Sequence, residues 1–536
     1  MKKNFFVYMT SFFCGMSVMA VELSATRMLA TTFSSSSIIY TIVIGLIMIS
    51  LSIGNVIGGR SADKQKNADK LYFMIGIASV WIAIIPVIGK YVTVLSAAIF
   101  VFILPENLIV AGSITSCLII FSFPLVIMGM VSPYLVKLGL KDISNSGKTA
   151  GEIYALSTIG SIIGTFVPTF VTIPTLGTSK TFFVFAIILN LISLYYFVTN
   201  KRKIIRSVIT TLIIITLALA PLNSSYAFWE KNIVYEGESM YNYLKVTEYK
   251  DSVILSTNVA FGVQSIYKKN NTLSGYYYDY GLMAPFFIRD TSFDKKLNVL
   301  ILGLGTGTYA KQCKRYFPNS STDGVEIDQK IVDLSKQYFE LKENEAKIYV
   351  NDGRTFLMSK EAKRYDLIMV DAYHDITIPF HMSTVEFFRQ VKEHLRDNGV
   401  ILININMRSE KNNEITDYLT QTVKHVMNKV YKYDLQTGTN TLVFASDDKN
   451  CIENYKNNIS ILSESDPLFK ISNSVKSNLV EISEANHIFT DDIAPVELMG
   501  QKMLDDVVGS ELEYFKQQLK SSGNGIKGIF DMISNS

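Results

Sequence analysis

The sequence predicts an α-helical transmembrane bundle followed by a small antiparallel β domain and a Rossmann-like α/β domain. One observation is a split in composition: residues up to about Leu222 are mostly apolar, whereas charged residues and Asn reach the density of a soluble protein from Trp229 onward. The other is a change of pattern after the apolar half, first to short strands and then to strands that alternate with helices. The 536 residues suffice for about two or three domains.

Composition excludes several classes of protein. The chain is 48% hydrophobic and 18% charged, with a mean hydropathy of +0.23, which argues against a secreted, fibrous or disordered protein. Its net charge of +3 is too small and too dispersed to indicate nucleic-acid binding. The cysteines are scattered without a CxxC pair, so we expect neither a disulfide framework nor a metal site; they are Cys14, Cys117, Cys313 and Cys451.

The N-terminal half contains apolar runs long enough to cross the ~30 Å of hydrocarbon in a bilayer. These runs are Phe5–Leu29, Ser37–Val56, Leu71–Ile88, Cys117–Leu135, Ile153–Val171, Thr181–Val198 and Ile204–Leu222. A further apolar stretch, Val92–Gly112, is interrupted by Pro105-Glu106-Asn107. We therefore predict about seven or eight spans in a multi-pass protein of the cell membrane, with the lipid bilayer as a partner.

Two predicted spans carry pairs of glycines four residues apart. The pairs are Gly54 with Gly58 and Gly160 with Gly164. Glycines at this spacing lie on one face of a helix and let a second helix backbone approach closely. We expect a tightly packed bundle.

The chemistry is expected in the second half, where polar residues follow a series of predicted strands. The strand Asn298–Leu302 runs into Gly303-Leu304-Gly305-Thr306-Gly307, and a helix follows. Such a loop lets backbone N–H groups approach a ligand. Acidic residues fall at the carboxyl ends of the next strands, in Glu326-Ile327-Asp328, Asp352-Gly353 and Asp371. Ligands bind at this edge of open parallel sheets.

These residues favour a particular nucleoside. The loop reads GxGxG rather than the GxGxxG of dinucleotide oxidoreductases, and an acid about twenty residues after the loop is placed to bind ribose hydroxyls. The pattern looks like the S-adenosylmethionine-type site of class I methyltransferases. Each carboxylate, taken alone, is also explained as a helix cap.

The chain resembles the fused membrane-bound relatives of spermidine synthase, the polyamine aminopropyltransferases. These combine a hydrophobic bundle with a small strand domain and a class I methyltransferase-like domain. The resemblance is carried by Tyr154–Gly164, Gln264-Ser265, Tyr278, the Gly303 loop, Glu326-Ile327-Asp328, Asp352-Gly353, Asp371, Pro379–Phe388 and Thr490–Pro495.

On this resemblance we predict four segments. They are a multi-span membrane domain (1–224), a small antiparallel β domain (230–285), an S-adenosylmethionine-type α/β domain (290–500) and a C-terminal helix and tail (501–536).

The resemblance implies transfer of an aminopropyl group from decarboxylated S-adenosylmethionine to a small amine such as putrescine, without a metal. Carboxylates would attract the ammonium groups, and one of them would accept or relay a proton. By resemblance Asp371 is the central acid, Asp375 a second catalytic acid, and Tyr278 and Gln264 orient donor and acceptor. The nucleoside would be held by Gly303, Gly305, Gly307, Glu326 (ribose), Asp352 (adenine amine) and Gly353. A homodimer is compatible with the resemblance.

The chain also departs from the family pattern. The glycine loop has Thr306 where soluble spermidine synthases have an acid, and Asp279 follows Tyr278 where those enzymes commonly have His. A second acid is expected three residues after Asp371, but His374 stands there and Asp375 follows. Thr306 keeps an S-adenosylmethionine-dependent methyltransferase open as an alternative, because an acid in the loop would repel the carboxylate of that donor.

A third reading is a transporter or sensor with a nucleoside-binding soluble domain. Its sequence support is the pair of ionisable residues in or near the first span, Glu22 and Arg27.

The side of the membrane depends on the span count. Positive residues cluster at Lys2-Lys3, Arg60–Lys70, Lys137–Lys148 and Lys201–Arg206. Placing all four clusters inside leaves the second half outside after seven spans, whereas eight spans return it to the cytoplasm. Because the donor nucleoside is made in the cytoplasm, we expect the cytoplasmic side.

Overall fold

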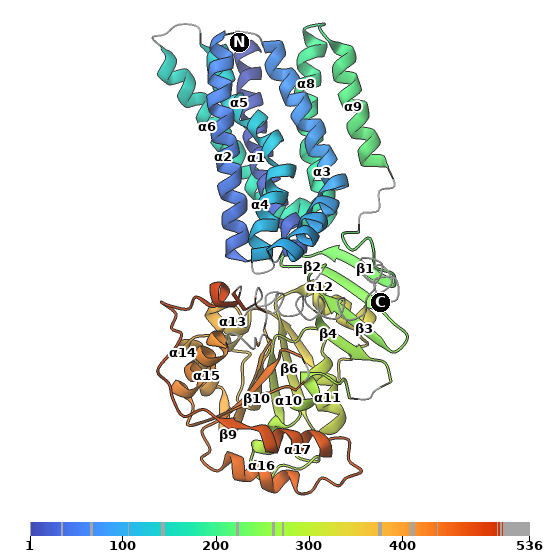
Figure 1. Cartoon of the computed structure of the whole chain (residues 1–536), viewed down its shortest axis with the longest axis vertical. Helices are drawn as coiled ribbons and strands as arrows, with labels where there is room; N and C mark the ends of the chain where they lie inside the picture. Colours follow the sequence, from blue (N-terminus) through green and yellow to red (C-terminus); the bar gives the residue numbers. More distant parts are fainter. Residues whose placement is uncertain are drawn as a thin grey trace. The chain divides into compact units, whose positions relative to one another are not determined.

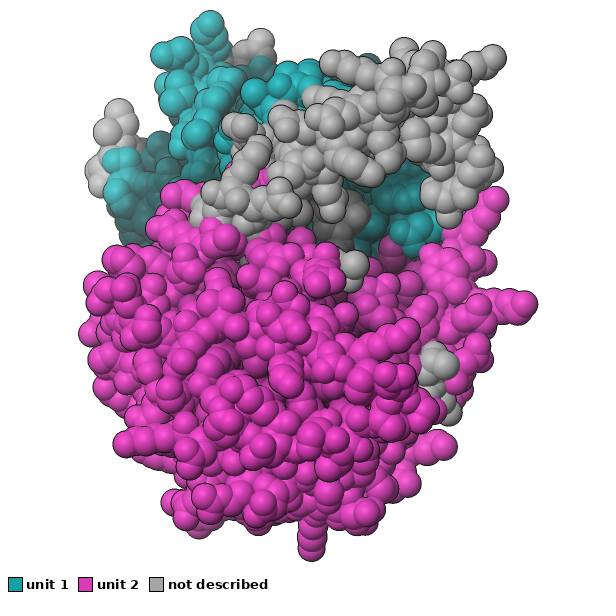
Figure 2. All heavy atoms as spheres, turned by 60° about the horizontal axis from the view of Figure 1, so that its bottom comes forward, with its two compact units in different colours: residues 1–230, 236–243, 258–260 teal, residues 231–235, 244–257, 261–536 magenta. Residues whose placement is uncertain are grey.

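The computed structural model describes residues 2–506, except 34–35, 65–67, 105–106, 141–144, 221–224, 260–262, 271–272, 373–377, 407, 409–412, 437, 501 and 504–505. Its contacts divide the chain into two compact units (Figure 2). Unit 1 comprises Met1–Glu230, Glu236–Tyr243 and Asn258–Ala260, and unit 2 comprises Lys231–Tyr235, Leu244–Thr257 and Phe261–Ser536. The four-segment division stays a prediction, and most of segment 501–536 lies outside the described residues.

Unit 1 is built of helices that run roughly alongside one another (Figure 1). They are α1 (Lys2–Phe33), α2 (Ser37–Lys64), α3 (Ala68–Ile103), α4 (Leu108–Ile120), α5 (Ser122–Gly139), α6 (Ser146–Val167), the π-helix η3 (Pro168–Thr172), α7 (Ile173–Leu176), α8 (Thr178–Thr199) and α9 (Ile204–Leu219). In the described part of the chain, 6 helical segments are long and apolar enough to cross a membrane. This is fewer than predicted, because α4 has 13 residues and α9 has 16.

Two helix boundaries differ from the expectation drawn from hydropathy. The predicted span Leu71–Ile88 is part of α3, which continues through Pro86 and Lys90 as far as Ile103. The predicted span Cys117–Leu135 is divided, because α4 ends at Ile120 and α5 begins at Ser122. Apolar character alone does not mark these boundaries, since both sides of each break are hydrophobic.

The glycine pairs lie at close contacts between helices, which confirms the packing prediction. A Cβ added at Gly160 would lie 2.0 Å from the carbonyl oxygen of Phe12, and one at Gly164 would lie 2.1 Å from that of Met16. The backbone of α6 therefore meets the backbone of α1 directly. Gly54 has the same role between α2 and α5, where an added Cβ would lie 2.2 Å from the carbonyl oxygen of Val126.

Polar contacts join these helices to the β-hairpin segment Glu236–Tyr243, which belongs to the same unit. The guanidinium group of Arg27, near the end of α1, donates to the carbonyl oxygens of Met240 and Tyr241. The carboxylate of Glu238 accepts from both the backbone N–H and the hydroxyl of Thr178, the first residue of α8. Arg27 thus has a structural partner at the hairpin.

A small antiparallel sheet follows the helices, with strand order β1-β2-β3-β4. Its strands are β1 (Ile233–Glu238), β2 (Tyr243–Glu248), β3 (Ser252–Ser256) and β4 (Val263–Lys268). All four lie within residues 230–285, where the sequence predicts a small antiparallel domain. Within unit 2, Leu244, Val246 and Leu255 pack with Ile331 and Leu334 of α12 (Gln329–Tyr338).

The second sheet has 8 strands in the order β12-β10-β11-β9-β8-β5-β6-β7. They are β5 (Asn298–Leu302), β6 (Ser321–Glu326), β7 (Lys347–Val350), β8 (Tyr365–Val370), β9 (Leu395–Ile405), β10 (Lys429–Asp434), β11 (Thr441–Ser446) and β12 (Val480–Glu481). Neighbours from β7 through β9 pair in parallel, and β9 through β12 pair antiparallel.

Helices cover both faces of this sheet, as expected for the predicted Rossmann-like fold. One side carries α13 (Gly353–Leu357), α14 (Val385–Glu393) and α15 (Glu414–Val426), and the other carries α10 (Tyr277–Gly281) and α11 (Thr308–Tyr316) (Figure 1). In the sheet, β6 lies beside β5 and β7 lies beside β6, in chain order. Strand β8 lies on the other side of β5. This reversal opens a crevice at the carboxyl ends of β5 and β8.

We predict that Gly160→Ala destabilises the helical unit, because the new methyl group has no room unless the backbones of α1 and α6 separate. Overpacking of this kind costs about 1–3 kcal/mol. The melting temperature of the full-length protein in detergent measures the effect.

Gly151→Ala in the same helix is the matched control, because a Cβ there meets nothing within 4 Å. Equal melting temperatures for the two variants would contradict close packing at Gly160.

Candidate active site

The candidate site lies at the crevice where the strand order reverses. Gly303 follows β5, Glu326 ends β6, Asp352 comes soon after β7 and Asp371 directly follows β8. Backbone hydrogen bonds hold the strand ends together: the N–H of Gly303 donates to the carbonyl oxygen of Val325 at 3.0 Å, and that of Asp371 donates to the carbonyl oxygen of Leu302 at 2.8 Å. Four predicted residues are therefore brought to one edge of the sheet.

Gly303 is required by the close approach of the strands on either side of it. Its φ is +90°, which disfavours any other residue. A Cβ at this position would lie 2.4 Å from the carbonyl oxygen of Asp371. The loop continues through Gly305 to Gly307, which is the N-cap of α11. The glycine loop is thus fixed by the end of β8 as well as by its own strand.

Glu326 is held by the glycine loop. Its side chain is 7% exposed, and its carboxylate accepts from the N–H of Gly305 at 2.9 Å and from the N–H of Asp328 at 3.1 Å. Burial raises the pKa of Glu326 to about 7. A carboxylate has about four acceptor positions, so this arrangement leaves capacity for ligand hydroxyl groups.

Asp352 is the N-cap of α13, which is the alternative explanation that the sequence left open. It accepts from the N–H of Thr355 at 2.8 Å, and its other oxygen lies 2.9 Å from Nε2 of His381. The hydrogen bond with His381 is the main cause that lowers the pKa of Asp352 to about 2. Asp352 is therefore ionised over the physiological range, and Gly353 beside it begins the helix.

An ion pair that the sequence did not predict joins the helix after Asp352 to a late segment of the chain. Arg354 donates to both carboxylate oxygens of Asp491, at 2.8 and 2.7 Å, and to the carbonyl oxygen of His381 at 3.0 Å. Asp491 also accepts from the hydroxyl of Thr384 at 2.6 Å. The late Thr490–Pro495 segment thereby holds the loop that carries His381.

Asp371 is held by two donors at the centre of the site. The hydroxyl of Tyr277 donates to Oδ2 at 2.6 Å, and Nδ2 of Asn404, near the end of β9, donates to Oδ1 at 2.8 Å. Burial raises the pKa of Asp371 to about 7, and the negative charge of Glu326 adds to this rise, while the two donors oppose it. Asp371 is a partly buried carboxyl group of fixed orientation that is ready to ionise near neutral pH.

Tyr278 and Gln264, which were predicted to act together, are neighbours. The hydroxyl of Tyr278 lies 3.3 Å from the Ser265 hydroxyl and donates to the carbonyl oxygen of Gln264 at 3.3 Å. Its ring lies beside that of Tyr277, with centroids 4.0 Å apart. The catalytic role of Tyr278 and the orienting role of Gln264 stay predictions.

The departures from the family pattern have structural explanations. Asp279 is buried and accepts from Ser274, Gly275 and Gln312, so it organises the chain around α10. Thr306 is 0% exposed and donates to the Ser265 hydroxyl at 2.6 Å. The loop threonine is therefore engaged with β4. The predicted acid Asp375 and its neighbour His374 lie outside the described residues.

Two residues that contact Asp371 were missed from the sequence. Asn404 lies near the carboxyl end of β9, so the strand-end rule applied to that strand would have identified it. Tyr277 lies in a run of three tyrosines, and sequence alone does not show which hydroxyl faces Asp371. Over the described residues, no cluster of three or more His, Cys, Asp or Glu side chains is arranged to hold a metal ion.

Comparisons with known proteins agree with this geometry. The family described as "Spermine/spermidine synthase domain" matches residues 290–442. A protein of Bifidobacterium longum described as a probable polyamine aminopropyl transferase is 40% identical over 349 residues, which cover 62% of this chain and 76% of that protein. The chain belongs to the polyamine aminopropyltransferase family. It is accordingly a transferase.

Other relatives are more distant. A polyamine aminopropyltransferase of Vibrio vulnificus is 25% identical over 244 residues, covering 44% of this chain and 79% of the relative. The crystal structure of a probable spermidine synthase from Corynebacterium glutamicum is 20% identical and covers 50% of this chain and 99% of that chain, with a TM-score of 0.40.

We predict that the site carboxyl groups make the stability of the ligand-free protein depend on pH. Asp371 and Glu326 titrate near pH 4 when unfolded and near pH 7 when folded, so the folded chain holds more protons between these values. Stability should therefore fall as pH rises from about 4 to about 7, and then level off. Asp371→Asn should make this fall shallower, as measured by melting temperature against pH.

Tyr277→Phe tests the hydrogen bond to Asp371. Because Tyr277 favours the ionised carboxylate, its loss should raise the pKa of Asp371 further and extend the fall in stability above pH 7. Tyr276→Phe is the matched control, since the Tyr276 side chain is exposed. Coincident profiles for the two variants would refute the assigned role of Tyr277.

Proposed function

We propose that this protein is a membrane-anchored aminopropyltransferase that uses decarboxylated S-adenosylmethionine as donor and a small amine such as putrescine as acceptor. The observation that carries the proposal is the Asp371 carboxyl group, held by Tyr277 and Asn404 at the crevice beside the glycine loop. The neighbouring Glu326 supports a nucleoside at the same edge of the sheet. The 6 apolar helical segments support the anchoring.

The reaction requires a base and a negatively charged site. The neutral acceptor nitrogen attacks the carbon next to the donor's sulfonium, so that a C–N bond forms and the C–S bond breaks. The electron pair of the broken bond neutralises sulfur, and methylthioadenosine leaves. The new ammonium group then loses a proton, for which ionised Asp371 is the proposed acceptor. Tyr277 would position this carboxylate through its hydrogen bond.

The charges of the site favour the decarboxylated donor. Its described acids are Glu326, Asp352 and Asp371, while the guanidinium of Arg354, two residues after Asp352, is already paired with Asp491. A negatively charged site attracts sulfonium and ammonium groups and repels the carboxylate of S-adenosylmethionine. Binding of a cation should also lower the raised pKa of Asp371 and so favour the form that accepts a proton.

The deciding experiment gives both donors to the purified full-length protein in lipid nanodiscs. We expect calorimetry to show tighter binding of decarboxylated S-adenosylmethionine, and mass spectrometry to show putrescine gaining an aminopropyl group. Methyl transfer from S-adenosylmethionine without aminopropyl transfer would establish the methyltransferase alternative. Nucleoside binding without turnover, together with amine flux into proteoliposomes, would establish the transporter or sensor alternative.

Asp371→Asn should lower turnover by ~10²-fold or more while donor binding is largely kept, because the amide keeps the shape but cannot accept the proton. Asp333→Asn is the matched control, since Asp333 is an exposed residue of α12 whose described hydrogen bond is to Gln329. Turnover of Asp371→Asn close to that of the control would remove Asp371 from its proposed role.

Glu326→Gln should weaken donor binding by roughly 10–100-fold, because a charged acceptor of ribose hydroxyls becomes a neutral amide. Titration calorimetry with the donor measures this. Unchanged affinity would show that Glu326 supports the glycine loop without binding the ribose.

We also propose that the catalytic half faces the cytoplasm, where the donor is made. Protease treatment of intact cells tests this side. Cleavage after Trp229 without lysis would place the site outside and contradict the proposal.

A further inference from the structure

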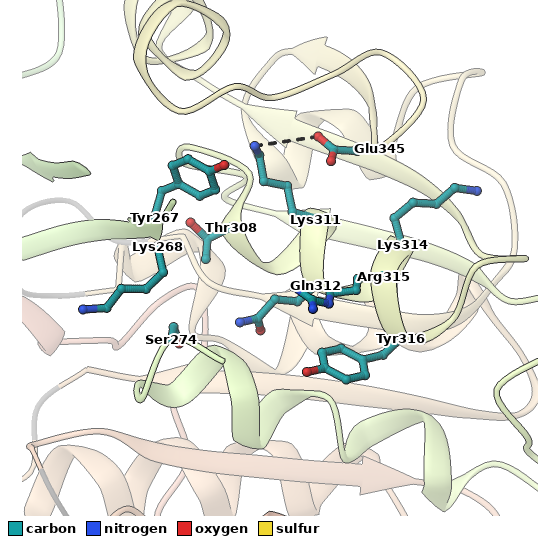
Figure 3. Close-up of a pocket in the computed structure, with 10 residues that line it drawn as sticks. All are labelled: Tyr267, Lys268, Ser274, Thr308, Lys311, Gln312, Lys314, Arg315, Tyr316 and Glu345. Carbon is teal, nitrogen blue, oxygen red and sulfur yellow. Dashed lines mark ion pairs between the residues drawn. The ribbon is translucent and has the colours of Figure 1, made fainter. Parts of the chain in front are cut away.

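A cavity lies beside α11. It has a volume of about 290 Å³ and is lined by 10 residues, which come from β4, the segment before α10, α11 and the region around Glu345 (Figure 3). None of the proposed nucleoside or catalytic residues lines it. Its size approaches the lower end of the range for small-molecule sites.

Positive charge dominates the lining of this cavity. The lining contains one acid, Glu345, and four basic residues, which are Lys268, Lys311, Lys314 and Arg315. Glu345 lies 4.0 Å from Nζ of Lys311, the ion pair drawn in Figure 3. A cleft lined by one sign of charge concentrates ions of the opposite sign. This polarity is the reverse of the acidic donor site, so the cavity is unsuited to a polyamine.

The basic groups keep most of their charge uncompensated. Lys311 donates to the carbonyl oxygen of Glu340 at 2.7 Å, and Lys314 donates to that of Pro318 at 2.7 Å, but neither carbonyl carries a formal charge. Across the described residues, no carboxylate forms an ion pair with Lys268 or Arg315. These two side chains are therefore available to an anion.

Gln312 is a fixed part of the cavity wall. Its side chain lines the cavity and is 8% exposed. Nε2 donates to Asp279 at 2.6 Å, whereas Oε1, which is buried, has no hydrogen-bond partner among the described residues. Oε1 has almost no accessible surface, so a ligand in the cavity contacts the basic side chains rather than this atom.

The geometry points to a binding site for a small phosphorylated compound between β4 and α11. Its phosphate oxygens would contact Lys268 and Arg315. Phosphate is favoured among anions because it offers several acceptor oxygens to basic groups that come from two elements. The site is independent of the donor nucleoside.

The test is titration calorimetry of the full-length protein in detergent with sodium pyrophosphate as the probe, in 150 mM KCl. We expect one saturable site per chain. Lys268→Gln combined with Arg315→Gln should weaken binding at least tenfold. Lys476→Gln combined with Arg389→Gln, which removes the same charges from exposed positions of α17 and α14, should leave it unchanged.

Two further variants keep the outcome decisive. Arg315→Glu, which reverses one exposed charge, should abolish binding even where the double variant folds poorly. Glu326→Gln should leave pyrophosphate affinity unchanged, because the probe does not occupy the nucleoside site. Heat that does not saturate, binding that survives both cavity variants, or a tenfold change in Glu326→Gln would each overturn the assignment.

Discussion

The contact on which the site depends is the meeting of the ends of β5 and β8. Only a glycine at position 303 lets the backbone after β5 pass the carbonyl group of Asp371, and the N–H of Asp371 in turn bonds to Leu302. This contact brings the carboxyl groups of Asp371 and Glu326 close enough for the charge of one to raise the pKa of the other. The protein thus keeps two acids in an environment that disfavours both charges, and a cationic ligand relieves that cost.

Sequence reasoning located the strand ends because the chemistry there is local. Hydrophobic runs that end in glycine or an acid identify the edge of a parallel sheet, so Gly303, Glu326, Asp352 and Asp371 were found without coordinates. Contacts between distant segments were not found. The ion pair of Arg354 with Asp491 joins residues 137 positions apart, and either side chain alone has the appearance of an ordinary surface charge. Which of Tyr277 and Tyr278 directs its hydroxyl at Asp371 depends on the orientation of the backbone at the start of α10. No residue pattern specifies that orientation.

In the apolar half, hydropathy indicated which residues are helical but not where helices begin and end. Both sides of a break such as Ile120 to Ser122 are apolar, so the break leaves little trace in composition, and the predicted span Leu71–Ile88 stopped two residues before Lys90 although α3 continues through it. Lys90 is in fact 4% exposed and donates to the carbonyl oxygen of Ser225. The glycine pairs predicted the helix contacts better than hydropathy predicted the helix ends. Glycine at these positions is a steric requirement of close backbone packing and does not depend on polarity.

The contacts of Glu238 and Arg27 show that the helices of unit 1 also stabilise a β-hairpin. Thr178 at the start of α8 has a buried side chain whose hydroxyl and N–H both donate to Glu238, and Arg27 at the end of α1 satisfies carbonyl groups of the same hairpin. Removing the helices would leave the Glu238 carboxylate and these carbonyl oxygens without their partners, at a cost set by their desolvation. The hairpin joins β1 to β2, and the small sheet that these strands begin also contains β4, the strand of Gln264 and Ser265. Folding of the turn between β1 and β2 therefore depends on helices of the same unit, which complete the polar groups of this hairpin.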